Sequence, residues 1–163
     1  MMMRLLGAAC IVALLAACSL SPTRKGQDAR IVDESQYCGT SSQNSEVHYF
    51  ADRDTFDDWL KYRSIKTFDP ALARNGGVII VDMGQRPTGG YNLKLNRDKS
   101  TIKNGTLTLN MTWNAPRLDA AVSQALIAQC VAIKPPTGEY NRVEVVDQLG
   151  NPRGQASLDR SGG

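Results

Sequence analysis

The strictest pattern in this sequence is the alternation of polar and apolar residues from Thr106 to Trp113 (TLTLNMTW). Every second position of the segment is apolar: Leu107, Leu109, Met111 and Trp113. Successive side chains of a β-strand point to opposite faces of a sheet, so the pattern predicts a strand with one face in a core and the other in solvent. Asn104-Gly105, directly before it, is typical of a tight turn between two strands. The chain is therefore expected to build a sheet around this segment.

Other segments predict further strands and a single helix. Short apolar or β-branched runs predict strands at Val47–Phe50, Gly77–Met83, Tyr91–Leu95, Cys130–Ile133 and Arg142–Asp147. Asp52–Arg63 (DRDTFDDWLKYR) repeats apolar residues at spacings of three and four and begins with acidic residues, as an amphipathic helix does. Ala115–Gln129 fits either a helix or an extended crossing. We predict a mainly β fold with a minor α part: a small antiparallel β sandwich or half-open barrel with one short amphipathic helix.

The composition limits the functions that this chain can have. With 163 residues, 42% hydrophobic and 21% charged, it has the make-up of one globular domain. A dispersed net charge of +3 argues against binding to nucleic acid. His48 is the only histidine, which excludes a two-histidine metal site, and no other cluster has the spacing of metal ligands. We expect no metal, no cofactor, no small-molecule substrate and no catalytic residues.

The N-terminus has the pattern of an export signal. Arg4 gives it a positive charge, and Leu5–Ala17 is an apolar run of 13 residues, shorter than the ~20 residues of a membrane-spanning helix. The run ends in Leu15-Ala16-Ala17-Cys18, which resembles the lipobox of bacterial lipoproteins. There the small residues admit the signal peptidase, and the cysteine thiol accepts diacylglycerol. The alternative is an ordinary cleaved signal beside a chance cysteine. We predict a signal peptide at residues 1–17 and lipidation at Cys18, with acyl chains such as palmitate.

Lipidation would hold the protein on a membrane, because several acyl chains bind a bilayer stably where one is marginal. Residues 18–36 are predicted to be the acylated cysteine and a flexible tether, since Ser19–Arg30 is polar and contains Pro22 and Gly26. Ser19 follows the cysteine, a position where lipoproteins of this type tend to carry Asp when they stay in the inner membrane. We expect a lipid-anchored protein of the bacterial cell envelope, at the outer membrane and facing the periplasm.

The four cysteines reduce to one pair after processing. Cys10 leaves with the signal peptide and Cys18 is acylated, so Cys38 and Cys130 remain in an oxidising compartment. A disulfide between them is predicted, closing a loop of about 90 residues and stabilising the fold by roughly 4–5 kcal/mol in the chain-entropy description. The alternatives are two buried thiols, or a catalytic pair of Cys38 with His48. The spacing of that pair matches no known catalytic motif.

The most distinctive loop is Met83–Tyr91 (MGQRPTGGY), which joins two predicted strands. Its proline fixes one φ angle, and its glycine pair permits positive φ, so a tight and stiff turn is expected. One interpretation is a hairpin needed only for folding. The other is a partner-binding loop, because a stiff loop loses little entropy on binding and can present Arg86 and Thr88 outward. The candidate contact residues are Gly84, Gln85, Arg86, Pro87, Thr88, Gly89, Gly90 and Tyr91.

The run Gly77–Leu95 (GVIIVDMGQRPTGGYNLKL) resembles the C-terminal domain of PrcB-like protease-complex lipoproteins, most specifically over Gly84–Tyr91. Downstream pieces keep the same order, and the resemblance extends roughly to Gly154. The pieces are Ala115-Pro116, Ser123–Leu126, Cys130–Ile133 and VEVVDQLGNPRG. The chain departs from the family at Ile127–Gln129, where members often carry proline. The resemblance implies a non-catalytic lipoprotein that associates with or stabilises a secreted protease, and it assigns no binding residues.

A second resemblance gives an alternative. Pro87–Tyr91 is similar to the Asn-Pro-Thr-Thr-Gly-Tyr loop with which chagasin-like inhibitors plug papain-type proteases, although Arg86 replaces the Asn and no match to their two other loops is evident. The prediction is an accessory or stabilising subunit of a secreted protease. The alternatives are an inhibitor that uses Gln85–Tyr91, or a purely structural envelope lipoprotein. Residues 37–150 are expected to form the β-rich PrcB-like domain, and residues 151–163 a loose tail.

Overall fold

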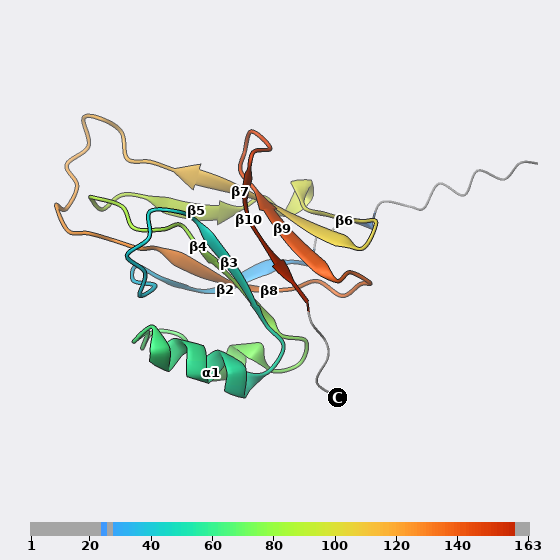
Figure 1. Ribbon diagram of the computed structural model, residues 1–163. Helices are drawn as coiled ribbons and strands as arrows, with labels where there is room; N and C mark the ends of the chain where they lie inside the picture. Colours follow the sequence, from blue (N-terminus) through green and yellow to red (C-terminus); the bar gives the residue numbers. More distant parts are fainter. Residues whose placement is uncertain (1–23, 26–27, 159–163) are drawn as a thin grey trace, which may run out of the picture.

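The computed structural model describes residues 24–25 and 28–158. Its strands form two sheets packed face to face, and helix α1 (Arg53–Tyr62) covers the outer side of one of them (Figure 1). The four-stranded sheet has the order β2-β8-β4-β3, with bounds Arg30–Ser35, Cys130–Lys134, Val78–Asp82 and Glu46–Phe50. The six-stranded sheet has the order β1-β6-β7-β9-β10, with bounds Arg24–Lys25, Thr101–Lys103, Thr106–Asn114, Arg142–Val146 and Pro152–Ser157. Strand β5 (Asn92–Leu95) also pairs with β7. Two short 3-10 turns, η1 and η2, span Pro70–Ala73 and Arg97–Lys99.

The predicted fold class is confirmed: the described residues form a mainly β sandwich with one α-helix. One pairing differs from the expected antiparallel pattern, because β7 and β9 run parallel. The reason lies in the connection between them. After β7 the chain crosses into the other sheet and forms β8, and it then returns to the first sheet to start β9 at the level where β7 starts.

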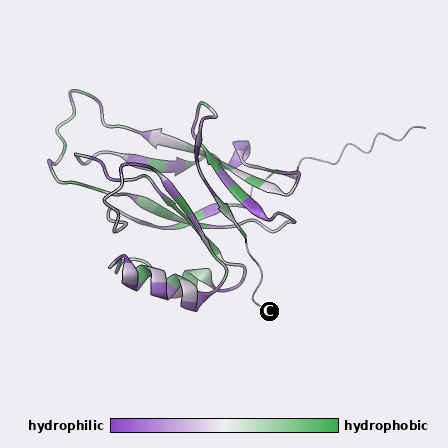
Figure 2. Cartoon of the chain, in the orientation of Figure 1, coloured by the Kyte–Doolittle hydropathy of each residue, from purple (hydrophilic) through white to green (hydrophobic). Residues whose placement is uncertain are grey.

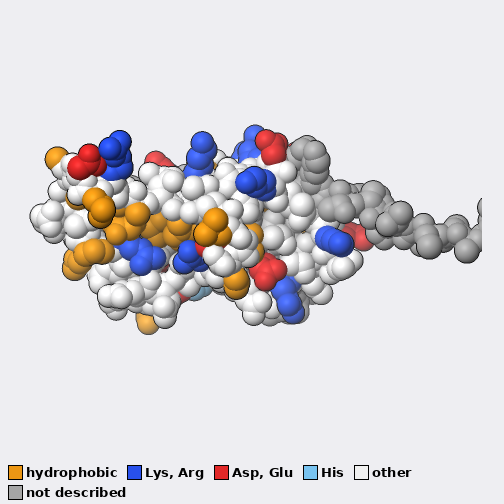
Figure 3. All heavy atoms as spheres, turned by 90° about the horizontal axis from the view of Figure 1, so that it is seen from above, with side chains coloured by type: hydrophobic (Ala, Val, Ile, Leu, Met, Phe, Trp, Pro, Cys, Tyr) orange, Lys and Arg blue, Asp and Glu red, His pale blue; other side chains and the backbone are white. Residues whose placement is uncertain are grey.

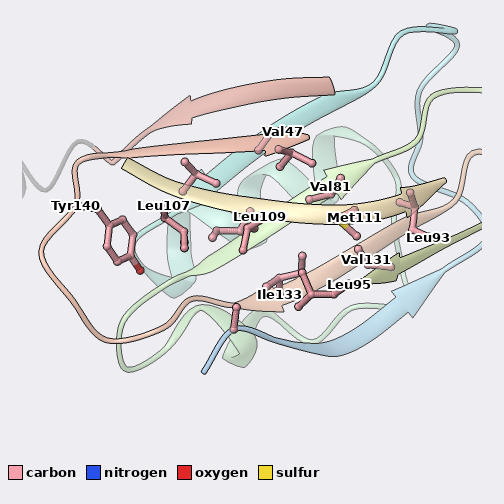
Figure 4. Packing of buried hydrophobic residues seen from close by; sticks show 14 of the residues in the cluster. Val47, Val81, Leu93, Leu95, Leu107, Leu109, Met111, Val131, Ile133 and Tyr140 are labelled. Carbon is pink, nitrogen blue, oxygen red and sulfur yellow. The ribbon is translucent and has the colours of Figure 1, made fainter. Parts of the chain in front are cut away.

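Strand β4 separates two hydrophobic cores. Ile79 and Val81 face the core between the sheets, whereas Val78 and Ile80 face the core under α1. All five residues of β4 are buried, which explains why its sequence is continuously apolar rather than alternating. Figure 2 shows hydrophobic residues along this sheet and both hydrophobic and hydrophilic residues on α1. Figure 4 shows the inter-sheet core, to which β7 contributes the predicted apolar face of its alternating segment.

Helix α1 forms as the sequence predicts. The Asp52 side chain accepts a hydrogen bond from the Thr55 N–H at 2.9 Å, which caps the first turn. Phe56 and Leu60 are buried against the four-stranded sheet. Trp59 is half-buried at the edge of this core, and its ring packs against that of Phe50 with the ring centroids 5.1 Å apart.

The predicted disulfide is confirmed. Cys38 is bonded to Cys130, the first residue of β8, with their Cα atoms 5.7 Å apart. Both cysteines are fully buried in the core under α1. Because the Cys38 sulfur is part of this bond, it is not a free thiol, and the alternative of a catalytic Cys38 with His48 is excluded.

Two predicted boundaries are wrong. The expected tether reaches residue 36, but Arg30–Ser35 forms β2, which pairs with β8 and half-buries Ile31 and Val32. The expected loose tail begins at residue 151, but Pro152–Ser157 forms β10 beside β9. Both are edge strands with one neighbour in their sheet, so their sequences are mostly polar and lack a clear alternation.

The predicted signal peptide at 1–17, Cys18 and residues 19–23 and 26–27 of the expected tether lie outside the described residues. Within the described ranges 24–25 and 28–158, none of the helices has the length and apolar character needed to cross a membrane.

Candidate functional site

Three loops meet at one end of the sandwich: residues 39–45 before β3, residues 83–91 between β4 and β5, and residues 115–129 between β7 and β8. We call this the three-loop end; it lies on the left in Figure 1. The middle loop contains the candidate contact residues that the sequence predicted. The structure therefore places them in the centre of a composite surface and not on an isolated hairpin.

The loop at 39–45 braces one side of the middle loop. The Gln85 N–H donates to the Ser42 carbonyl oxygen at 2.7 Å. The Arg86 guanidinium donates to the Met83 carbonyl oxygen at 2.6 Å and, more weakly, to the Gln43 carbonyl oxygen at 3.4 Å. Arg86 is therefore folded back onto its own loop, and the expectation that it faces outward is wrong. Two of its N–H donors are thus satisfied by loop carbonyls, and the Met83 carbonyl also accepts from the Ser45 hydroxyl at 3.4 Å.

The segment at 115–129 braces the other side. It is an extended crossing, which resolves the ambiguity left by its sequence. Arg86 and Ile127 exchange two backbone hydrogen bonds, of 2.7 and 3.1 Å, and the Gly89 N–H donates to the Ser123 carbonyl oxygen at 2.9 Å. The two segments thus form a short ribbon that extends beyond the sheets.

Gln129 holds both ends of the middle loop. Its backbone carbonyl accepts from the Met83 N–H at 2.9 Å, where the loop begins, and its side-chain Oε1 accepts from the Leu93 N–H at 3.0 Å, just after the loop ends. The Gln129 side chain is buried, so these are hydrogen bonds shielded from water. Sequence reasoning missed this residue, and its only signal was a polar residue directly before an apolar strand.

Two glycines of the middle loop have conformations that require glycine. Gly84 has φ +79°, and a Cβ there would lie 2.6 Å from the Gln43 carbonyl oxygen. Gly90 has φ +84°, and a Cβ there would lie 2.9 Å from side-chain atoms of Pro116 and Val122. Gly89 does not have the positive φ that the sequence suggested. Its place is fixed by close approach instead, since a Cβ would meet the Ser123 hydroxyl oxygen at 2.5 Å.

The outer surface of this end is apolar and largely uncharged. Leu118 is fully exposed, Leu126 is 65% exposed, and Pro87 is also exposed. Figure 3 shows hydrophobic side chains at the left end of the molecule and towards its middle. Arg117 and Asp119 neutralise each other through an ion pair of 3.1 Å. A shallow groove of about 250 Å³ lies between Leu126 and the loop, lined by Gln43, Gln85, Arg86, Pro87 and Leu126.

The remaining predicted contact residues differ in accessibility. Thr88 is half-buried and Gly90 is exposed, so both remain accessible to a partner. Tyr91 is half-buried and packs against the inter-sheet core, where it anchors the loop. Gly84 and Gly89 are buried. Gln85 and Arg86 are half-buried and line the groove. The accessible part of the predicted set is therefore Gln85–Thr88 and Gly90, and the sequence had not singled out Leu118 and Leu126.

A buried carboxylate lies at the base of the three-loop end. Asp82 is the last residue of β4, and its side chain is fully buried. One carboxylate oxygen accepts from the Gly84 N–H at 2.8 Å, and the other has no hydrogen-bond partner and lies 3.8 Å from the Arg63 guanidinium. Burial raises the pKa of Asp82 to about 6, against the opposing effects of the Gly84 N–H and of Arg63.

Arg63 is shared by a second carboxylate. It donates to Glu46 at 2.6 Å, and Glu46 also pairs with His48 at 3.1 Å. Burial lowers the pKa of His48 despite this carboxylate, and the imidazole packs against Trp59 at 5.2 Å between ring centroids. Within the described ranges no group of three potential metal ligands comes together. Through Arg63, the charged side chains of Glu46 in β3 and Asp82 in β4 are linked to the end of α1 beneath the loops.

Fold and site together define a two-sheet β domain whose braced loops present an apolar surface at one end. Residues 78–134 match the family model described as PrcB C-terminal, which confirms the resemblance inferred from the sequence. The match covers 57 of the 163 residues, from the start of β4 to the end of β8, and so includes two of the three loops. It ends before the Gly154 limit that the sequence suggested. No curated protein and no solved structure matched the chain.

Proposed function

We propose that this protein is a non-catalytic accessory or stabilising subunit of a secreted protease and that it binds its partner through the three-loop end. The observation that carries the proposal is the PrcB C-terminal match, because the two loops at 83–91 and 115–129 lie inside the matched region. The family resemblance supplies the link with a protease complex. The structure supplies a surface, the three-loop end, through which such a partner could bind.

The physical properties of the three-loop end suit a binding surface. Exposed Leu118, Leu126 and Pro87 offer apolar area that a partner could bury, and contiguous exposed apolar groups often mark interaction sites. The hydrogen bonds of Arg86, Gly89 and Gln129 restrain the loops before binding. A restrained surface loses less conformational entropy when the complex forms.

We further propose that an acyl anchor at Cys18 tethers the protein to the envelope, at the outer membrane and facing the periplasm. Support comes from the sequence Leu15-Ala16-Ala17-Cys18 at the end of the apolar run. A Cys38–Cys130 disulfide is in keeping with an oxidising compartment. Incorporation of labelled palmitate into the wild type and not into Cys18→Ala would support the anchor, whereas equal labelling of both would contradict it.

The central experiment is crosslinking in intact cells, followed by purification from solubilised envelopes and mass spectrometry. A Leu118→Asp and Leu126→Asp double variant should recover at least tenfold less protease than the wild type, since it places charges in the apolar contact area. The control is Tyr62→Asp, which changes another exposed large residue, at the end of α1. Equal recovery with the double variant, or the absence of any protease from the wild-type sample, would contradict the proposal.

A second candidate function is inhibition of a papain-type protease, and the convergence of three loops at one end favours it. In such an inhibitor Pro87 and Thr88 would enter the active-site cleft, with the flanking loops in contact with its rims. Titration of a papain-type enzyme with the purified protein distinguishes the two functions. Loss of peptidase activity at stoichiometric concentration would favour inhibition, whereas unchanged activity would leave the accessory role. A purely structural envelope protein would neither inhibit nor recover a protease.

A further inference from the structure

Basic residues gather at the end of the sandwich opposite the three loops. In the six-stranded sheet Thr106 pairs with Lys103 on one side and with Arg142 on the other, so two basic residues flank one position. In the four-stranded sheet Arg30 pairs directly with Lys134. We call these four residues the basic end. The loop between β8 and β9 joins the two sheets here, which places both pairs at the same end of the molecule.

This arrangement has an electrostatic cost. Like charges directly opposite each other destabilise a sheet. Burial lowers the pKa of Lys134, and the positive charge of Arg30 lowers it further. Within the ranges that the structure describes, Arg30, Lys103 and Arg142 form no ion pair, and Lys134 donates only to the backbone carbonyls of Arg74 and Gly77.

Two acidic residues, Asp28 and Glu139, are exposed in the adjoining loops and form no ion pair with the basic end. The positive charge of this end is therefore left without protein partners among the described residues. Its complement would be an external surface that carries negative charge.

The chain enters the fold at this end. In β1, Arg24 lies opposite Ile102 and Lys25 opposite Thr101, so the antiparallel pairing brings the preceding residues in from the side of Lys103. Cys18 is six residues before Arg24. A chain of that length spans at most about 22 Å, whatever its conformation. An acyl anchor at Cys18 therefore keeps this end close to the bilayer.

The three loops lie at the far end of β7. That strand runs from Thr106, beside Lys103 and Arg142, to Asn114, where the crossing at 115–129 begins. At about 3.3 Å per residue its nine residues separate the two ends by about 26 Å. Figure 1 shows β6 on the right of the molecule and the long crossing between β7 and β8 on the left. The short tether allows the domain to lie on its side or to stand upright, and the charges of the basic end favour the upright orientation.

We propose that the basic end contacts anionic lipid headgroups and holds the three-loop end away from the membrane. The inference rests on the acyl anchor proposed above and does not depend on the identity of a protein partner. Each basic side chain close to an anionic bilayer strengthens binding by about fivefold, and salt weakens this attraction. The membrane thus sets the direction in which the loops can meet their partner.

The test is a measurement of orientation with the full lipoprotein reconstituted into vesicles of phosphatidylglycerol and phosphatidylcholine. A fluorophore is attached through Thr137→Cys, in the exposed loop between β8 and β9, or through Leu118→Cys at the three-loop end. A quencher attached to the lipid headgroups should reduce emission at position 137 at least threefold more than at position 118. In vesicles of phosphatidylcholine alone, or at high salt, the difference should decrease.

Charge reversal supplies the matched control. Lys103→Glu with Arg142→Glu should remove the difference in quenching. Lys66→Glu with Lys94→Glu changes the net charge equally, at exposed residues that form no ion pair among the described residues, and should preserve the difference. Equal quenching at the two positions of the wild type, no effect of reversal or salt, or failure of the wild type to stay with vesicles would overturn the inference. The salt titration of the wild type gives the same test if the reversed variant does not fold. No protease is present in the vesicles, so the result is independent of the proposed protease partner.

Discussion

Asp82 and Asp147 are both buried at the end of a strand, yet their carboxyl groups have opposite pKa shifts. Burial pushes the pKa of Asp147 upward, but hydrogen bonds from Asn151, Arg153 and Leu149 outweigh it and lower the pKa to about 2. For Asp82, burial dominates and raises the pKa to about 6. The number of donors makes the difference. Asp147 accepts five hydrogen bonds, whereas Asp82 accepts one, from the Gly84 N–H.

The two aspartates differ in where their hydrogen-bond donors and charge partners come from: the same turn for Asp147, and partly a distant element for Asp82. All the donors to Asp147 come from the next six residues, so the turn between β9 and β10 satisfies its own carboxylate. Asp82 depends on Arg63, which arrives from the end of α1 and is already bonded to Glu46. The base of the three-loop end is therefore less well satisfied than the ordinary turn, as sites that serve function often are.

The largest expected effect comes from adding a methyl group beside each aspartate. Gly84 and Gly150 both have positive φ, of +79° and +87°, so alanine costs each about 1–2 kcal/mol of backbone strain. At Gly84 the new Cβ would also lie 2.6 Å from the Gln43 carbonyl oxygen, whereas at Gly150 nothing lies within 4 Å. Overpacking adds about 1–3 kcal/mol, so Gly84→Ala should lower the free energy of unfolding by about 2–5 kcal/mol and Gly150→Ala by about 1–2. Urea denaturation measures the free energy of unfolding of both variants. Equal losses would show that the loop at 39–45 moves away from the new Cβ at no energetic cost.

The next effect is a dependence of stability on pH that should disappear in Asp82→Asn. Because the pKa of Asp82 is raised from 3.8 to about 6 by folding, the native state binds this proton more tightly. The contribution is complete below pH 3.8 and is lost as the pH rises through 6, which amounts to about 3 kcal/mol at most. The wild type should therefore lose stability relative to Asp82→Asn between pH 4 and pH 7. Comparing the two proteins at each pH removes the contributions of groups that do not interact with Asp82, and parallel profiles would contradict the raised pKa.

The smallest effect lies at lower pH and concerns Asp147. Its pKa is lowered by folding from 3.8 to about 2, so its contribution is present above pH 3.8 and is lost as the pH falls toward 2. The melting temperature of the wild type should fall further between pH 4.5 and pH 2.5 than that of Asp147→Asn, which has no such proton to gain. Thermal unfolding followed by circular dichroism measures this difference. If the melting temperatures of the two proteins fell by the same amount, the five hydrogen bonds would not be stabilising the ionised carboxylate of Asp147.

Much of the fold follows from local patterns in the sequence. The alternation at Thr106–Trp113 predicts β7 with its buried face, and the spacing in Asp52–Arg63 predicts α1 with Asp52 at its cap. Removing the two N-terminal cysteines from consideration leaves the pair that forms the disulfide. The edge strands β2 and β10 escape such reasoning, because a strand with one neighbour buries too little to impose a hydrophobic pattern.

The sequence predicts the central loop of the candidate site but not the contacts that surround it. The composition of Met83–Tyr91 correctly predicts a tight loop between two strands, since proline and glycine restrict or permit particular φ angles. The direction of the Arg86 side chain and the role of Gln129 do not follow from local patterns. Arg86 folds back onto the Met83 carbonyl of its own loop and, more weakly, onto Gln43, whereas Gln129 accepts from Leu93, 36 residues away in the chain. Leu118 and Leu126 become candidates only when the crossing is seen to project from the end of the sandwich.

By itself, then, the sequence did not determine the edge strands β2 and β10, but it determined most of the inner strands, where the helix begins, which cysteines pair and where the stiff loop lies. These depend on side-chain periodicity, capping and φ preferences, which act over a few residues, and on simple elimination for the cysteines. The tertiary structure alone decided that three loops meet, that β9 runs parallel to β7, and that Asp82 and Asp147 have opposite pKa shifts. Each of these depends on which distant donors and charges surround a group, and that is known only once the chain has folded.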